Sequence, residues 1–216
     1  MHIDRRLFLR GLGAAALSQL ACTDPIPSPT PVPPPGTGLQ TAQVNITQLA
    51  QAATQQQCEQ WCWAASISTI FNFYNHPLTQ QQIVVATYGN VFCLPANTTT
   101  TIGRDLSRLY IDNRGVRFSS RVISAYDYFN RINTFNNQLI VDALSNNNPL
   151  LYCNTHHAMV VYSVTYLPTP FGPDVRAVNV VDPWPFSPIT HALTASEMVV
   201  ADFGGEMTFL AQVQTS

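Results

Sequence analysis

Residues 55–66 read Gln-Gln-Gln-Cys-Glu-Gln-Trp-Cys-Trp-Ala-Ala-Ser, a polar run that turns into an apolar one around the second cysteine. We expect a helix over Cys62–Asn75, because apolar side chains recur there at spacings of four, three and four residues. A cysteine that opens a helix lies at the positive end of the helix dipole, where unpaired backbone N–H groups favour the thiolate. The stretch therefore predicts a nucleophilic thiol, Cys62, at the start of a helix.

Helical patterns dominate the first part of the domain and strand patterns the last. We expect further helices at Thr79–Tyr88, Thr101–Leu109 and Asn137–Leu144, and strands at Gln43–Ile46, Pro149–Cys153, Ala158–Tyr166, Val175–Val181 and Thr208–Val213. This order indicates an α+β domain, in which an N-terminal helical half packs on a C-terminal antiparallel β-sheet.

A general base for the thiol is predicted from the strand half. Residues 155–161 read Thr-His-His-Ala-Met-Val-Val, and His157 directly precedes the apolar strand. Asp182 ends the next strand, so its carboxylate can lie beside His157 across one hairpin and orient the imidazole. His156 is the adjacent alternative as base, and His191 lies in a predicted loop and is given no role.

Three motifs in this order resemble those of bacterial papain-like cysteine peptidases. They are the helix-opening Cys-Trp-Ala-Ala, the His-Ala-Met-Val-Val strand and the strand end Asp-Pro-Trp-Pro, and the likeness covers roughly residues 50–190. The chain is most similar to the group that includes bacteriocin-processing peptidases and a papain-like effector of plant pathogens. The resemblance implies a papain-like fold and a cysteine endopeptidase that acts on proteins or peptides, with Cys62 as nucleophile, His157 as base and Asp182 as its orienting partner.

The resemblance also implies a glutamine that helps to stabilise the oxyanion. Gln56 stands six residues before Cys62, the spacing that papain-like enzymes use, and Gln57 is the nearest alternative because the glutamine run leaves the register open. Trp61 stands where such enzymes usually have Gly or Ser, a departure that concerns the shape of the cleft rather than the chemistry.

The N-terminus reads as an export signal followed by a linker. Residues 1–22 combine paired arginines, Arg5 and Arg6, with a short apolar run, and they resemble a twin-arginine signal peptide. Cys22 ends a lipobox-like sequence and is a candidate for lipidation; cleavage near Ala21 is the alternative. Residues 23–40 are a proline-rich linker, and residues 41–216 form the peptidase domain. We therefore expect the protein in the periplasm, attached to a membrane through a lipid, or secreted.

The remaining cysteines indicate a disulfide, because an exported protein meets an oxidising compartment. We favour a Cys58–Cys93 bridge, which leaves Cys153 as a buried free thiol. The alternative is a Cys58–Cys62 bridge, which would make Cys62 purely structural.

Composition excludes some other classes of protein. Hydrophobic residues make up 46% of the chain and charged residues 10%, a balance typical of folded domains rather than disordered ones. The formal net charge is −2 and no basic stripe is present, so a nucleic-acid partner is not expected.

No metal or organic cofactor is implied by the motifs. A zinc site built from Cys58, Cys62 and the two adjacent histidines is disfavoured, because neighbouring residues of a strand point to opposite faces. Two alternative functions remain at this point. One is a cysteine amidase or transpeptidase of peptidoglycan, and the other is a papain-like lipoprotein that binds a partner without catalysis.

Overall fold

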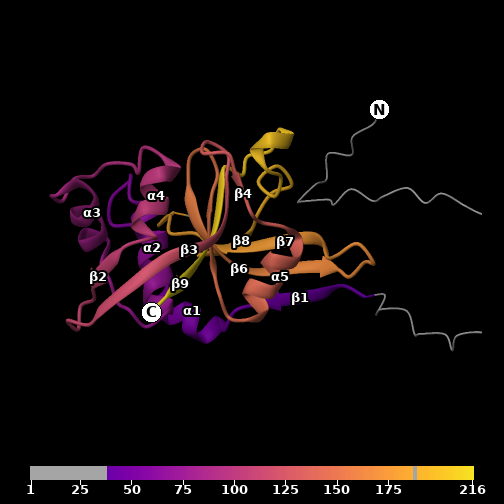
Figure 1. The fold of residues 1–216 in the computed structure, drawn as a ribbon, viewed down its shortest axis with the longest axis horizontal. Coiled ribbons are helices and arrows are strands. Elements are labelled where there is room, and N and C mark those ends of the chain that lie inside the picture. Colours follow the sequence, from indigo (N-terminus) through magenta and orange to yellow (C-terminus); the bar gives the residue numbers. More distant parts are fainter. Residues whose placement is uncertain (1–37, 187–188) are drawn as a thin grey trace, which may run out of the picture.

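The computed structural model describes residues 38–186 and 189–216. A helical half lies at one end of this region and an antiparallel sheet at the other, as Figure 1 shows. The α+β arrangement predicted from the sequence is therefore confirmed. The predicted signal peptide, the lipidation site at Cys22 and nearly all of the linker lie outside the described residues.

Of the five helices within this region, four begin at a residue whose side chain caps the first turn, and the helix that Cys62 opens does not. Thr79 and Gln82 form a capping box at the start of one helix, and Gly89, with φ of 77°, ends it. Their bounds are α1 Ile46–Ala52, α2 Cys62–Phe73, α3 Gln80–Tyr88, α4 Thr99–Asp105 and α5 Asn137–Ser145.

Two of the predicted boundaries near these helices were wrong. The helix expected at Thr101–Leu109 begins earlier and ends earlier, because the Thr98 side chain accepts the N–H of Thr101 and caps the helix at that point. The strand expected at Gln43–Ile46 lies at β1 Gln40–Gln43 instead. Asn45 then caps α1, its side chain accepting the N–H of Gln48.

Helix α2 is the central helix of the domain. It packs against α1 and α3 on one side and against strands β5 and β6 on the other. Its small residues Ala64 and Ala65 are fully buried, and so are Ile67 and Ile70. A helix surrounded in this way is held rigidly along its whole length, which fixes the position of its first residue.

The sheet has nine strands within the described residues, and its main path runs β2-β3-β9-β5-β6-β7-β8, with β1 on β6 and β4 on β3. All of its pairings are antiparallel. The remaining bounds are β2 Leu109–Ile111, β3 Arg117–Asp127, β4 Ile132–Asn133, β5 Leu150–Cys153, β6 Ala158–Leu167, β7 Asp174–Val181, β8 Thr190–Ala192 and β9 Phe209–Thr215.

Strands β2 and β3 were missed by the sequence analysis. Strand β3 reads Arg-Phe-Ser-Ser-Arg-Val-Ile-Ser-Ala-Tyr-Asp and lacks a continuous apolar run, although Phe118 and Tyr126 are buried. Its partner β9 supplies the hydrogen bonds along its length, so long-range pairing and not local pattern creates this strand.

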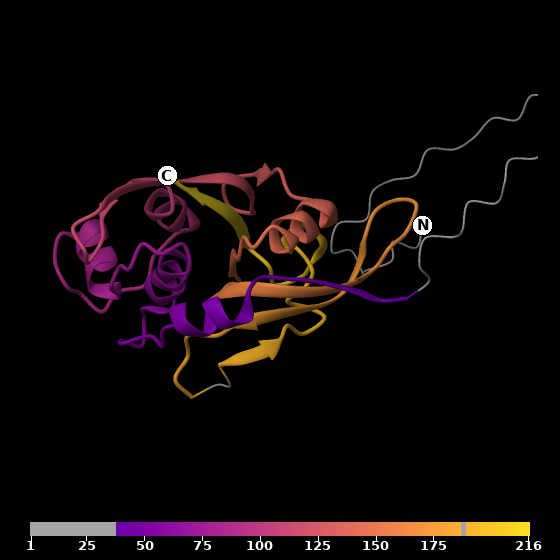
Figure 2. The ribbon, with the colours of Figure 1, turned by 90° about the horizontal axis from the view of Figure 1, so that it is seen from below.

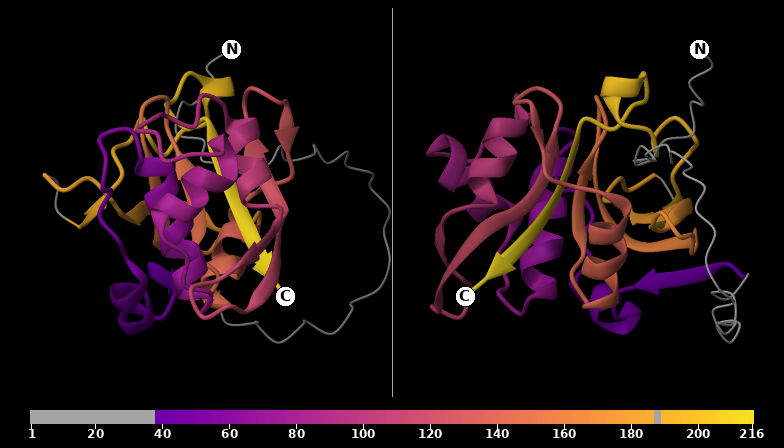
Figure 3. Two further views of the ribbon diagram at one scale, coloured as in Figure 1. Left: turned by 90° about the vertical axis from the view of Figure 1, so that its left-hand side faces the viewer. Right: turned by 45° about the vertical axis from the view of Figure 1, so that its right-hand side comes forward.

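Helix α5 covers a different part of the sheet from α2. It packs on β1 and β6, and Figure 2 shows it apart from α2–α4. Strand β9 lies between β3 and β5 in the sheet, and the right-hand view of Figure 3 shows it as the yellow strand that leads to the C-terminus. Among the described helices, none combines the length and the apolar character that a bilayer crossing requires.

Candidate active site

Cys62 is the first residue of α2, as the sequence predicted. The N-cap residue Trp61 makes no side-chain cap, and the first turn holds no acidic residue. The N–H groups of that turn therefore remain available near the sulfur, where they favour negative charge. Cys62 is a free thiol and is partly exposed.

The turn between β5 and β6 presents His157. The Asn154 side-chain oxygen accepts the backbone N–H groups of His156 and His157 at 2.9 and 2.7 Å, and the Asn154 N–H donates to the His157 carbonyl at 3.0 Å. These bonds fix the backbone at the start of β6 and so restrict the directions open to the His157 side chain.

A buried hydrogen bond ties this turn to α2. The hydroxyl of Ser66, one turn after Cys62, donates to the carbonyl of Ala158 at 3.0 Å. Ala158 directly follows His157, so the bond sets the distance between the helix that carries the thiol and the strand that carries the imidazole.

Asp182 reaches His157 across the β6–β7 pairing. Val181 is the register partner of Val160, and Asp182 continues the chain by one residue. Its Oδ1 lies 2.6 Å from His157 Nε2 and also accepts the N–H of Trp184 at 2.8 Å. Because Nε2 faces the carboxylate, Nδ1 is the ring nitrogen left to face Cys62.

The electrostatics of this group favour a charged imidazole. Burial alone would lower the pKa of His157, but the hydrogen bond to Asp182, the nearby Cys62 sulfur and the charge of the Asp182 carboxylate raise that pKa to about 9. Burial acts to raise the pKa of Asp182, and the bonds from His157, Trp184 and His191 more than offset this and lower it. The arrangement can thus hold a thiolate beside an imidazolium.

His191 is a neighbour of this group that the sequence analysis missed. Its Nε2 lies 3.2 Å from Asp182 Oδ2, the carboxylate oxygen that His157 does not contact. Strand β8, which carries it, is only three residues long and gave no strand signal. No local pattern could have placed this residue beside Asp182.

His156 and the glutamines lie elsewhere. His156 is exposed and lines the cleft, but its ring has no contact with Asp182 in the structure. Gln56 is buried, and its amide nitrogen donates to the carbonyls of Cys58 and Glu59 at 3.1 and 3.0 Å. Gln57 is exposed and bonds through its side chain to Gln81.

The loop before the nucleophile is fastened to the loop that follows α3. Cys58 and Cys93 form a disulfide, the pairing that the sequence analysis favoured, and Cys62 stays outside it. The indole N–H groups of Trp61 and Trp63 donate to the carbonyls of Phe92 and Leu94 at 2.8 and 3.2 Å. Three consecutive residues, 92–94, are therefore fastened to the nucleophile segment. We call this set of three links the loop clamp.

The loop clamp explains how a residue as large as Trp61 is accommodated directly before Cys62. Trp61 is only 4% exposed, so it packs beneath the loop instead of projecting into the cleft. The departure from Gly or Ser at this position is thus accommodated by the loop after α3.

A cleft of about 490 Å³ opens beside the thiol. Residues 95–99 form one wall and residues 153–157 with Trp184 form another, while Phe129 and Glu59 lie at the edge. Of the described residues that line it, only Glu59 carries a full charge apart from the histidines. The lining of the cleft is therefore largely uncharged.

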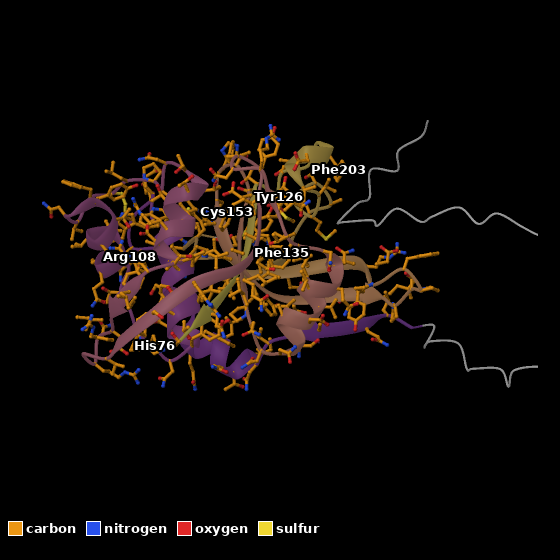
Figure 4. The ribbon with its side chains drawn as sticks, viewed as in Figure 1. His76, Arg108, Tyr126, Phe135, Cys153 and Phe203 are labelled. Atoms are coloured by element: carbon orange, nitrogen blue, oxygen red, sulfur yellow. A yellow bond between two sulfur atoms is a disulfide. The ribbon has the colours of Figure 1, made fainter. Side chains whose placement is uncertain are left out.

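The second free thiol is of a different kind. Cys153 lines the cleft from a buried position, and Figure 4 labels it where the helical half meets the sheet. Burial, with smaller contributions from the charges of Cys62 and Asp127, raises the pKa of the Cys153 thiol well above its usual value. It is therefore poorly suited to act as a nucleophile.

The zinc alternative finds no support in this geometry. Cys58 is used in the disulfide, and among residues 38–186 and 189–216 no three His, Cys, Asp or Glu side chains gather in a way that could hold a metal ion.

The helical half, the antiparallel sheet and the thiol at the head of the central helix define a papain-like cysteine peptidase. A family model described as papain-like cysteine protease AvrRpt2 matches residues 41–195, and the chain belongs to this family. A comparison with curated proteins found no match. The resemblance drawn from the sequence motifs is confirmed by the family match.

Proposed function

We propose that the protein is an exported cysteine endopeptidase that works through Cys62, His157 and Asp182. The observation that carries the proposal is the position of His157, which has a buried carboxylate 2.6 Å from Nε2 and the thiol of the α2 terminus on its other side. This arrangement supplies an activated nucleophile and a proton donor in one cleft.

In the proposed reaction the Cys62 thiolate attacks the carbonyl carbon of the scissile peptide bond. His157, as imidazolium, gives its proton to the nitrogen of the leaving amine as the C–N bond breaks, which leaves an acyl-enzyme. Neutral His157 then takes a proton from water as the water attacks the thioester, and Cys62 departs as the thiolate. Asp182 stabilises the imidazolium at each stage.

The oxyanion needs hydrogen-bond donors beside Cys62. The backbone N–H of Cys62, at the open end of α2, is one proposed donor. Gln56 is the second, although both hydrogens of its amide now serve the carbonyls of Cys58 and Glu59. Donation to an oxyanion would require Gln56 to release one of these bonds.

The proposal is tested by offering the purified protein a casein-like protein and purified cell wall side by side. We expect cleavage of the protein substrate, and its complete loss in Cys62→Ala and His157→Ala. Release of wall peptides alone would assign the enzyme to peptidoglycan. A thiol-reactive acyl warhead that failed to label Cys62 would argue for a binding protein without catalysis.

We also propose export through the N-terminal signal, because paired arginines, an apolar run and a proline-rich linker precede the domain. Replacing Arg5 and Arg6 by lysine should retain the protein inside the cell, as measured by fractionation. Cys22→Ala should release an exported protein from the membrane fraction if Cys22 carries a lipid. Unchanged export of the lysine variant would contradict the twin-arginine route.

A further inference from the structure

Asp182 has an imidazole on each of its two oxygens. Oδ1 contacts His157 Nε2 at 2.6 Å, and Oδ2 contacts His191 Nε2 at 3.2 Å. The carboxylate side chain is only 6% exposed, so few water molecules can replace either contact. The second imidazole is itself 30% exposed and lies at the edge of this group.

The sheet places His191 on the same face as the carboxylate. His191 is the register partner of Val180, and Val180 lies two residues before Asp182. Residues two apart on a strand share a face, so His191 and Asp182 are diagonal neighbours across β7 and β8. The backbone N–H of Asp182 also donates to the carbonyl of Ile189 at 2.9 Å, which holds the chain before β8 against the aspartate.

The two ring nitrogens of His191 face different acceptors. Nε2 faces the carboxylate, and Nδ1 lies 3.1 Å from the carbonyl of Ala192. A carboxylate oxygen can only accept a hydrogen bond and is the stronger of the two acceptors, so we assign an N–H to Nε2. His191 then donates to Oδ2 and opposes rotation of the carboxylate away from His157.

We propose that His191 is a positioning residue, which holds the Asp182 carboxylate in the orientation that aligns and charges His157. The inference rests on the proposed function, since it assigns His191 to the same nucleophile pair. His191 acts through Asp182 and does not touch the reacting atoms.

The test compares His191→Leu, which removes the donor, with His191→Gln, which keeps an N–H at nearly the same place. Thr190→Leu is the matched control, because Thr190 is an exposed neighbour on β8 and, as the adjacent residue of the strand, points to the other face. Each variant is assayed for kcat and KM on a peptide, for the rate at which iodoacetamide alkylates Cys62 at neutral pH, and for thermal unfolding.

We expect His191→Leu to lower kcat and the alkylation rate on the order of tenfold, by analogy with the loss caused by removing an outer hydrogen-bond partner of a metal-binding histidine. KM should change little, His191→Gln should recover most of both rates, and Thr190→Leu should behave as the unchanged protein. In an Asp182→Ala background His191→Leu should have no further effect, because the carboxylate through which His191 acts is already absent.

Three results would overturn the inference: full rates in His191→Leu, equal losses in the Leu and Gln variants, or an undiminished loss in the Asp182→Ala background. The alkylation rate is measured without substrate, so it tests the role of His191 independently of the proposed peptidase function. A protein that cleaves no peptide but shows the expected alkylation pattern would contradict the proposed function and leave the role of His191 supported. Cleavage that depends on Cys62 and His157 but not on His191 would contradict the role of His191 and leave the proposed function supported.

Discussion

His157 combines burial with a raised pKa, and the causes of the rise are its neighbours Asp182 and Cys62. A buried histidine without partners would lose its proton more easily than one in water. Here the hydrogen bond to Asp182 and the nearby Cys62 sulfur outweigh burial and bring the pKa of His157 to about 9. In the proposed reaction, the imidazolium that protonates the leaving amine is therefore the resting form of His157 near neutral pH.

The first prediction concerns the alkaline limit of activity. In the unchanged protein kcat/KM should fall above about pH 9, where His157 loses its proton. Asp182→Asn removes the charge of the side chain but keeps its shape, so the pKa of His157 should fall toward its ordinary value of about 6.5. The alkaline limit of kcat/KM should then move to lower pH by the same amount. The pH profile of kcat/KM and an NMR titration of the histidines measure this shift.

The same shift has a consequence for stability with a definite sign. A folded pKa that lies above the unfolded value stabilises the fold fully below about pH 6.5, and this contribution is lost as the pH rises through about 9. The free energy of unfolding of the unchanged protein should decline across that window more steeply than that of Asp182→Asn. Parallel curves for the two proteins would contradict the assignment of the raised pKa to Asp182.

Gln56 provides a second prediction at the level of one residue. Gln56→Met keeps the length of the side chain and removes its donors without adding charge. If the amide serves the oxyanion as proposed, kcat should fall by about 100-fold or more, while KM changes little. Kinetics and thermal unfolding are measured together, with Gln57→Met as the control. A lowered melting temperature with unchanged kcat would restrict Gln56 to bracing the loop through the carbonyls of Cys58 and Glu59.

Among the elements, α2 and the loop clamp decide the shape of the site. The helix is surrounded by other elements, and the hydroxyl of Ser66 ties it to the start of β6. The loop clamp fastens residues 92–94 to the segment from Cys58 to Trp63, which contains Cys62, and the next residues of that loop form a wall of the cleft. The cleft wall is thus tied covalently to the loop before Cys62.

The third prediction follows from the covalent link of the loop clamp. The two cysteines lie 35 residues apart, and closing a loop of that length in the unfolded chain corresponds to about 4 kcal/mol of stability by the chain-entropy relation. The paired variant Cys58→Ala/Cys93→Ala should lose up to about this free energy of unfolding in denaturant titrations. KM should rise as well, because the cleft wall loses one of its three links. Cys153→Ala, outside the loop clamp, is the comparison, and equal stability of the paired variant would contradict a role in holding the loop.

At the scale of the whole molecule, the last strand is the one that unites the sheet. Strand β9 lies between β3 and β5 and pairs with both. Its residues Phe209, Leu210 and Ala211 are buried. The family match ends at residue 195, yet the sheet is not complete without the segment beyond it.

The fourth prediction tests that dependence. A chain that ends at residue 195 keeps Cys62, His157 and Asp182 but loses β9, so β3 and β5 would expose unpaired backbone groups and apolar side chains. We expect it to lack cooperative unfolding and peptidase activity, as measured by circular dichroism and a peptide assay. A cooperatively folded, active fragment would show that β9 is dispensable.

The sequence alone determined the local parts of this protein. It placed Cys62 at the start of a helix, a further helix at Thr79–Tyr88, and His157 and Asp182 at the ends of apolar strands. These features depend on capping groups, apolar spacing and motifs within a few residues, so they can be read along the chain. The papain-like family followed from the same motifs and is shown by the family match.

Only the tertiary structure decided the contacts between distant segments. It gave β3 its partner β9, brought His191 to the free oxygen of Asp182 and turned the Gln56 amide toward the loop carbonyls. Each of these contacts joins side chains or strands whose own neighbourhoods carry no signal for the partner. Pairing over long distances depends on the free energy of the assembled sheet and not on local preference.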